Sequence, residues 1–292
     1  MTDPAFFGDT IINWLHGLDS LLVLLPAKFL LLLEQPAFYF IILPIMYWCL
    51  DRSKALRLAV LGSLGAFLGR SMDLSLSGYF GLPAGVSFLS LYLIAAAAMW
   101  LLAMNFFVRR RWQWLGFAMP LILLLAEAVV HGGTLPGLLV SVLAGWGLAA
   151  VWLIPGRRFE LLLSRLHPRV KISLAALLAF GMNAVLLTET GLPGLFFGAV
   201  LGASLLDLRL VFKPAGGTLL QRLLRIPLGF GGLALLYFIG DRLLVLGGDS
   251  LYPLVYFIFS TVLAFWCTFA APWVFVRLLH SDQEKSGFCN TK

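Results

Sequence analysis

The sequence predicts an all-α fold, a polytopic transmembrane helical bundle of about nine spans, and three observations carry that prediction. Hydrophobic residues make up 61% of the 292 residues and charged residues only 12%, whereas charged residues are about a quarter of a soluble domain. The mean hydropathy is +0.95. All 21 Lys and Arg residues except Lys28, Arg70 and Arg242 lie in five gaps between long apolar runs, as in membrane proteins that keep their cations in short cytoplasmic loops.

The cation-rich gaps alternate with gaps that hold almost no cations. The rich gaps are 51–58, 109–111, 157–171, 209–225 and the tail from 277, and the poor gaps lie near 70–80, 131–134, 189–192 and 247–250. Because cation-rich loops stay in the cytoplasm, the first span starts outside and the C-terminus lies inside. We therefore expect an integral protein of a bacterial-type cytoplasmic (inner) membrane, with its N-terminus outside.

Nine apolar runs are each bounded by such gaps, and a span needs roughly 20 residues. The expected spans are 36–50, 54–69, 80–107, 112–130, 134–154, 172–188, 193–210, 223–246 and 251–276. The segment before them, 11–33, places Trp14, His16, Asp19 and Lys28 among Leu and Val. We predict an interfacial helix there, and an additional span is the alternative.

The loop 155–171 divides the chain because it combines five cations with Pro155, Gly156 and Pro168. The expected parts are an N-terminal interfacial or additional membrane helix (1–35), a membrane core (36–156), a basic cytoplasmic loop (157–171), a C-terminal four-span extension (172–279) and a cytoplasmic tail (280–292). Pairs of glycines four residues apart, Gly65 with Gly69 and Gly198 with Gly202, indicate close helix packing.

Charge and cysteine usage restrict the partners. The net charge is +7 and the isoelectric point about 9.6, but the cations sit in short loops without a contiguous basic face, which argues against nucleic acid. Membrane lipids are the expected partners, and other membrane protein subunits are a further possibility. The three cysteines are scattered and we expect free thiols. No metal and no cofactor are expected, since no cluster of ligand residues is present.

Charged residues near the outer ends of the spans each need a reason, because charge within a membrane is costly. Arg70 and Asp73 end the second span, Glu127 and His131 end the fourth, and Arg242 lies near the outer end of the eighth. One interpretation is structural: Arg70 pairs with Asp73, Glu127 with His131, and Arg242 reaches the headgroups. The other is that Arg70, His131 and Arg242 converge on an outward pocket for an anion, with Asp73 and Glu127 orienting them.

Several runs resemble the PAP2 superfamily of membrane lipid phosphatases (type 2 phosphatidic acid phosphatases). The runs are LPAGV at 82–86, VHGGTLPGLLVSVLAG at 130–145, EQPAFY at 34–39 followed by Pro44, Tyr47, Trp48 and Asp51, and GLFFGAVLG at 194–202 with Arg209, Phe212 and Arg222. The family carries the motifs Lys-x6-Arg-Pro, Pro-Ser-Gly-His and Ser-Arg-x5-His-x3-Asp near the extracytoplasmic side. The resemblance implies a PAP2-like core with additional C-terminal helices and no metal.

The same resemblance implies that the catalytic motifs are degenerate. Arg70 stands at the first-motif Lys. The motif positions that have lost their residues are Ser77 and Gly78 (for Arg-Pro), Val86 (for His), Val130 with His131 (for Ser-Arg), Gly137 (for the nucleophilic His) and Ser141 (for its Asp partner). Phosphoryl transfer through a phosphohistidine needs an imidazole nucleophile and a proton donor for the leaving group. We therefore lean against an enzyme.

Three functions follow from these residues. The first is a catalytically silent PAP2-like membrane protein that binds a lipid phosphate or another anion at Arg70, His131 and Arg242, or that serves as a scaffold subunit. The second is an active lipid or polyprenyl phosphate phosphatase with a displaced constellation around His131, in which Asp73 or Glu127 is the general acid. The third is a lipid transporter or scramblase.

Overall fold

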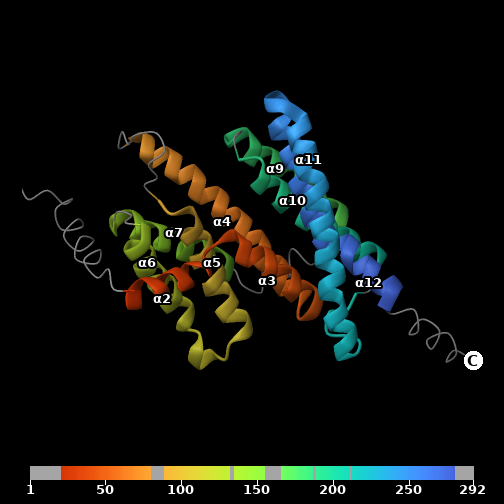
Figure 1. Ribbon diagram of the computed structural model, residues 1–292, viewed down its shortest axis with the longest axis horizontal. Coiled ribbons are helices and arrows are strands. Elements are labelled where there is room, and N and C mark those ends of the chain that lie inside the picture. Colours follow the sequence, from red (N-terminus) through yellow and green to blue (C-terminus); the bar gives the residue numbers. More distant parts are fainter. Residues whose placement is uncertain are drawn as a thin grey trace, which may run out of the picture. The chain divides into compact units, whose positions relative to one another are not determined.

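The computed structural model describes residues 21–79, 89–131, 135–154, 166–186, 189–210 and 212–279, and these residues form helices without a strand (Figure 1). The elements are α2 (Leu21–Leu31), α3 (Pro36–Cys49), α4 (Arg52–Tyr79), α5 (Leu91–Phe107), η1 (Arg110–Trp112), α6 (Leu115–His131), α7 (Leu135–Leu153), α9 (Pro168–Val185), α10 (Gly191–Arg209), α11 (Leu219–Phe265), η2 (Trp266–Ala270) and α12 (Ala271–Leu279). Residues 1–20, most of the basic loop 157–171 and the tail 280–292 lie outside the described residues.

Within the part of the chain that the structure describes, four helical stretches are long and apolar enough to cross a membrane: Leu135–Leu153, Gly191–Arg209, Leu219–Leu243 and Leu251–Leu278. A fifth span results if α2 and α3, which are separated by a bend, count as one broken span. The apolar helices α5 and α6 have 17 residues each. The structure therefore confirms an all-helical chain with membrane spans, and the number nine stays a prediction.

Several helix boundaries differ from those expected, and three of them have local contacts at the boundary. Helix α4 continues ten residues past the expected end at 69; in this extension Ser71 and Ser75 bond back to carbonyl oxygens four residues earlier, and Arg70 pairs with Asp73. Helix α5 begins at Leu91, where Ser90 caps it. Helix α9 begins at Pro168 instead of 172, because His167 caps its first turn and proline is favoured at that position.

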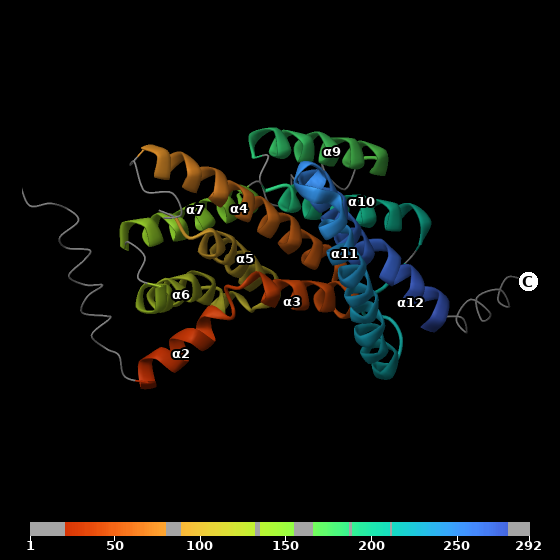
Figure 2. The same cartoon turned by 45° about the horizontal axis from the view of Figure 1, so that its top comes forward.

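The chain divides into two compact units: Met1–Phe40 with Leu61–Phe159, called unit 1 below, and Ile41–Val60 with Glu160–Lys292, called unit 2. In unit 1, α5 lies between α6 and α7 (Figure 2). Their shared core consists of Leu93, Ala96, Leu123, Leu124, Ala128, Leu138 and Val142. Helix α2 packs against α6 through Ala27, Leu31 and Ala126.

Small residues bring α5 and α7 into close contact. The run Ala95–Ala98 on α5 is buried, and a Cβ atom on Gly145 of α7 would stand 2.5 Å from the carbonyl oxygen of Ile94. Only glycine fits there, because any Cβ atom would clash with that carbonyl oxygen. Small residues of this kind let the backbones of membrane helices approach closely. A Cβ on Gly65 of α4 would stand 3.4 Å from the Cα of Ala95, which confirms close packing at the first glycine pair.

Unit 2 is built on α10 and α11. Gly194 would place a Cβ 2.5 Å from the carbonyl oxygen of Phe257, and a Cβ on Gly198 would likewise meet the carbonyl oxygen of Thr261. A Cβ on Gly202 would meet the side-chain hydroxyl of Thr268. These three glycines form one face of α10 at a spacing of four residues. The glycine pair 198 and 202 is thus confirmed as a helix-packing surface.

Helix α11 doubles back on itself, although its 47 residues are helical throughout. The rings of Tyr237 and Phe259 lie 6.2 Å apart, whereas 22 residues of straight helix would separate them by about 33 Å. The Trp266 indole donates to the Gly229 carbonyl oxygen at 3.0 Å. Tyr237 thus contacts Phe259, whereas the earlier residue Gly229 contacts the later residue Trp266. The two arms of α11 are therefore antiparallel (Figure 1). They correspond to the expected spans 223–246 and 251–276.

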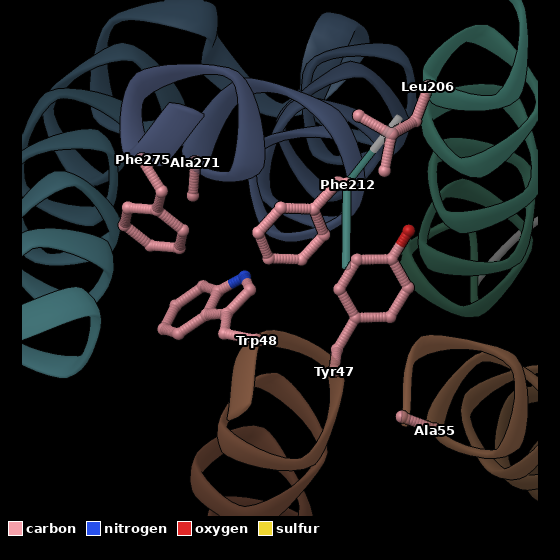
Figure 3. Packing of buried hydrophobic residues seen from close by; sticks show 7 residues of the cluster. All are labelled: Tyr47, Trp48, Ala55, Leu206, Phe212, Ala271 and Phe275. Carbon is pink, nitrogen blue, oxygen red and sulfur yellow. The ribbon is translucent and has the colours of Figure 1, made fainter. Parts of the chain in front are cut away.

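An aromatic cluster fills the centre of unit 2 (Figure 3). Its buried members are Tyr47, Trp48, Ala55, Leu206, Phe212, Ala271 and Phe275. The Tyr47 hydroxyl donates to the Thr268 carbonyl oxygen at 3.0 Å, and the Trp48 indole donates to that of Cys267 at 2.8 Å. The π-helical turn η2, in which these carbonyl oxygens lie, is therefore satisfied by side chains from α3.

Candidate functional site

The first turn of α5 is held by side chains from three other segments of unit 1. Ser90 caps the helix by accepting the Leu93 N–H at 3.3 Å, and its hydroxyl donates to Glu34 Oε1 at 3.2 Å. Its own N–H donates to Ser141 Oγ of α7 at 3.0 Å. The backbone N–H and the hydroxyl of Ser90 thus both have hydrogen-bond partners, and these bonds fix the residue at which α5 starts.

Asp73 of α4 holds the residue before that cap. Its Oδ1 accepts the Leu89 N–H at 3.0 Å and the Ser77 hydroxyl at 3.4 Å, and its Oδ2 lies 3.6 Å from Arg70 Nη1. The Asp73 side chain is 5% exposed, while that of Arg70 is 33% exposed. The carboxylate is therefore used by backbone, hydroxyl and guanidinium together, as a buried charge requires.

A second acidic pair lies beside Ser90. Glu34, in the turn between α2 and α3, is buried, and its carboxyl group lies next to that of Glu127 on α6. Glu127 also interacts with Ser90 and with His131, one turn further along α6. The Oε2 atoms of both glutamates are buried without a hydrogen-bond partner. The Tyr39 hydroxyl, also buried and without such a partner, interacts with Glu34 and Trp100.

The residues expected to bind an anion are distributed as follows. Arg70 pairs with Asp73, and His131 is exposed at the end of α6. Arg242 is exposed on α11 in unit 2, with its guanidinium 5.3 Å from the Phe238 ring centroid. The pairing that the structural interpretation expected for Arg70 is present. Convergence of the three cations stays a prediction.

The positions that the resemblance identifies as degenerate have structural contacts. Ser141 is fully buried, donates to the Gly137 carbonyl oxygen at 2.8 Å and accepts the Ser90 N–H. Gly137 is buried, Ser77 donates to Asp73, Gly78 is exposed and Val130 packs beside α2. Val86 lies outside the described residues. Where a catalytic Asp would orient an imidazole, Ser141 supports the start of α5.

The charge balance at this end of unit 1 is acidic. Three carboxyl groups, those of Glu34, Asp73 and Glu127, are buried or nearly so, and Arg70 is the cation paired among them. An anion would meet those carboxylates as well as the guanidinium. Among the described residues no group of three or more His, Cys, Asp or Glu side chains fits a metal ion.

Sequence reasoning did not select Glu34 and Ser90 as site residues. Glu34 could have been selected, because it is the first acidic residue after Asp19 in a mainly apolar stretch. An acidic residue within a membrane needs a partner and is therefore a candidate site residue. Ser90 stands just before an apolar run, which is the usual place of an N-cap. Their pairing spans 56 residues, and no local pattern encodes that distance.

Residues 190–283 match the family model described as PAP2 superfamily phosphatase, transmembrane extension. This match confirms the resemblance to the PAP2 superfamily, and it covers α10, α11, η2 and α12 but not α9 of the expected C-terminal extension. Gly194–Gly202, one of the runs that carry the resemblance, lies within it. A search of curated proteins and a search of solved structures gave no match. The segment 190–283 is therefore similar to the transmembrane extension of PAP2 superfamily phosphatases.

Proposed function

We propose that this chain is a catalytically silent PAP2-like integral membrane protein that acts as a membrane scaffold. The single observation that supports this most is the use of Ser141. At the place of the catalytic Asp, a buried hydroxyl bonds to Gly137 and Ser90 and thereby connects α7 to α5. Gly137, at the place of the nucleophile, has no side chain with which to attack phosphorus.

The surroundings of Arg70 also favour a scaffold over an anion pocket. Its guanidinium lies beside the buried Asp73 carboxylate, so the positive charge is already offset. Glu34 and Glu127 place two further carboxyl groups near the same end of unit 1. Binding of a lipid phosphate at Arg70 and His131 remains the second arm of the proposal, because the Arg70 side chain keeps a third of its surface exposed and His131 is exposed.

Orientation and compartment belong to the same proposal. The alternation of cation-rich and cation-poor loops supports a bacterial cytoplasmic membrane with the C-terminus inside. In that orientation Arg70, Asp73, Glu127 and His131 lie toward the outside. Cysteine labelling of intact cells at 109–111 checks this, since reaction with an impermeant reagent there would reverse the topology.

Phosphate release tests the silent core directly. The purified full-length chain in lipid nanodiscs is given a long-chain polyprenyl phosphate, and inorganic phosphate is measured for the wild type, His131→Ala and His167→Ala. His167 is the matched control, because it is an exposed helix-capping histidine on α9 in unit 2. We expect release no greater than in empty nanodiscs. Release that His131→Ala abolishes and His167→Ala preserves would establish the displaced phosphatase instead.

Lipid binding separates the two arms of the proposal. Native lipid retained by the wild type, Arg70→Ala and the exposed control Arg169→Ala is extracted and its phosphate counted per protein. The scaffold predicts equal counts in all three. A specific loss in Arg70→Ala alone would favour the headgroup pocket, and lipid flipping by vesicles containing the wild type would favour a scramblase.

A further inference from the structure

Glu34 is buried and accepts the Ser90 hydroxyl, and its carboxyl group lies next to that of Glu127 in the interior of unit 1. An ionised carboxylate has only acceptor oxygens, so two adjacent carboxyl groups bond to each other only when one of them carries a proton. The contact therefore has a chemical requirement that the scaffold role does not explain.

Independent contacts favour a shared proton over two separate charges. Ser90 donates its hydroxyl to Glu34 Oε1, so this oxygen accepts a bond from outside the pair. The Tyr39 hydroxyl is buried and lies near Glu34 and Trp100. Both Oε2 atoms are buried and receive no hydrogen bond from a backbone N–H, a hydroxyl or a cation of the described residues. A proton held between the two carboxyl groups gives these oxygens a partner, as buried polar groups require.

Among the described residues, no cation beside the pair is available to neutralise a second glutamate charge, which favours a proton as the ligand. The groups that interact with the pair are Tyr39 (α3), His131 (α6, exposed) and the uncharged Ser90 before α5. On the neighbouring helices α2 and α4, Lys28 is exposed and Arg70 pairs with Asp73. Arg70 is paired with Asp73, so it is not available to neutralise a second glutamate charge. Two carboxylates in low dielectric repel each other strongly, and one bound proton removes that repulsion.

We propose that Glu34 and Glu127 share one exchangeable proton and form a proton-binding site in the membrane part of unit 1. His131 lies one helical turn from Glu127, interacts with it and is exposed. It supplies a route by which that proton exchanges with water. The proposal goes beyond the scaffold function and holds whether or not the core is silent.

Infrared spectroscopy tests the site on the whole protein in nanodiscs. Carboxylic acid and carboxylate groups absorb at separate frequencies, and ¹³C-labelled glutamate identifies the bands that belong to Glu. We expect the wild type at neutral pH to show a protonated glutamate band that disappears as the pH is raised. Absence of this band in the wild type would overturn the proposal without any variant.

Amide substitutions then assign the band. In Glu34→Gln or Glu127→Gln the amide donates the bond that the proton supplied, so the remaining carboxyl group ionises and the band is lost in both variants. Asp241→Asn, at an exposed acid of unit 2, is the control and leaves the band unchanged. A band that survives in either glutamine variant belongs to a separately protonated residue and refutes sharing.

A thermal measurement distinguishes a proton from a metal cation. The unfolded chain releases its glutamate protons at acidic pH, whereas the folded pair keeps one. The wild-type melting temperature therefore falls as the pH rises from acidic values until the pair deprotonates and then levels off, and Glu127→Gln loses that fall. Stabilisation of the wild type at high pH by Na⁺ or K⁺, with no protonated band at neutral pH, would mean that the pair binds a cation instead.

Discussion

Ser141 Oγ accepts the N–H of Ser90 at 3.0 Å and donates its own proton to the Gly137 carbonyl oxygen at 2.8 Å. One hydroxyl thereby joins α7 to the beginning of α5 and closes a bond within its own helix. Because Ser141 is fully buried, water does not replace either partner. A residue that the resemblance identifies as a degenerate motif position is thus part of the packing of unit 1.

Substitution of Ser141 by Ala is expected to destabilise the protein. It leaves the partly buried Ser90 N–H without the Ser141 acceptor, and the loss of a buried hydrogen-bond partner costs about 1–3 kcal/mol. The measurement is the free energy of unfolding by SDS titration in mixed micelles. Ser173→Ala is the matched control, because Ser173 also bonds to a carbonyl oxygen four residues back but is exposed on α9. An equal change in the two variants would contradict a special role for Ser141.

Asp73 offers a separate test of its two partners. Asp73→Asn keeps an oxygen for the Leu89 N–H but removes the charge beside Arg70, whereas Asp73→Ala removes both. Since an unsatisfied buried N–H costs more than a partly exposed ion pair contributes, we expect Asp73→Ala to lower the unfolding free energy more, by about 1–3 kcal/mol. The ranking is read from parallel SDS titrations, and equal losses would show that the Arg70 pair dominates.

Gly198 is expected to tolerate no added methyl group. An alanine Cβ there would meet the backbone of Thr261, which cannot rotate away, and overpacking of this kind costs about 1–3 kcal/mol. Gly181→Ala on α9 is the control, because its Cβ would meet no atom within 4 Å and alanine is the better helix former. Thermal unfolding followed by circular dichroism should rank Gly198→Ala below the wild type and Gly181→Ala at or above it.

Arg225 fastens the end of α3 to the loop before α11. Its side chain is fully buried and donates to the carbonyl oxygens of Trp48 at 3.0 Å, Pro214 at 2.6 Å and Gly216 at 2.8 Å. Its guanidinium also lies 5.3 Å from the Phe212 ring centroid.

Arg225→Met should therefore lower the unfolding free energy by about 2 kcal/mol or more, because bonds to charged donors contribute about 1.5–3 kcal/mol each. Arg225→Lys should recover only part of it, since an ammonium group lacks the planar fork. SDS titration measures both, with Arg169→Met at an exposed arginine as the control. Full stability of Arg225→Met would show that the carbonyl contacts are incidental.

The helices could be predicted from the sequence because an apolar run between polar gaps is a local signal. Their polar contacts could be predicted only where partners are near in sequence. Arg70 with Asp73 is such a case. The Ser90–Glu34 and Ser90–Ser141 contacts join residues 56 and 51 positions apart, and these depend on which helices pack together.

Helix boundaries failed for a related reason. Charge at Arg70 and Asp73 suggested that α4 ends there, but the carboxylate is satisfied within the fold and the helix continues to Tyr79. Arg225 was counted among loop cations, whereas it is buried under backbone carbonyl groups. The sequence shows that a charged residue would lose hydration free energy on burial. Only the tertiary contacts show whether hydrogen bonds and ion pairs offset that loss.

The reversal within α11 has a topological consequence. If each arm crosses the bilayer once, two crossings return the polypeptide to its starting compartment, so Leu219 and Leu279 share the same aqueous face. A fluorescent or enzymatic reporter fused after Leu279 then reports the compartment of the loop before α11, whose carbonyl groups Arg225 binds. Because the hairpin crosses twice, one measurement of the side on which Leu279 lies also gives the side on which that loop lies.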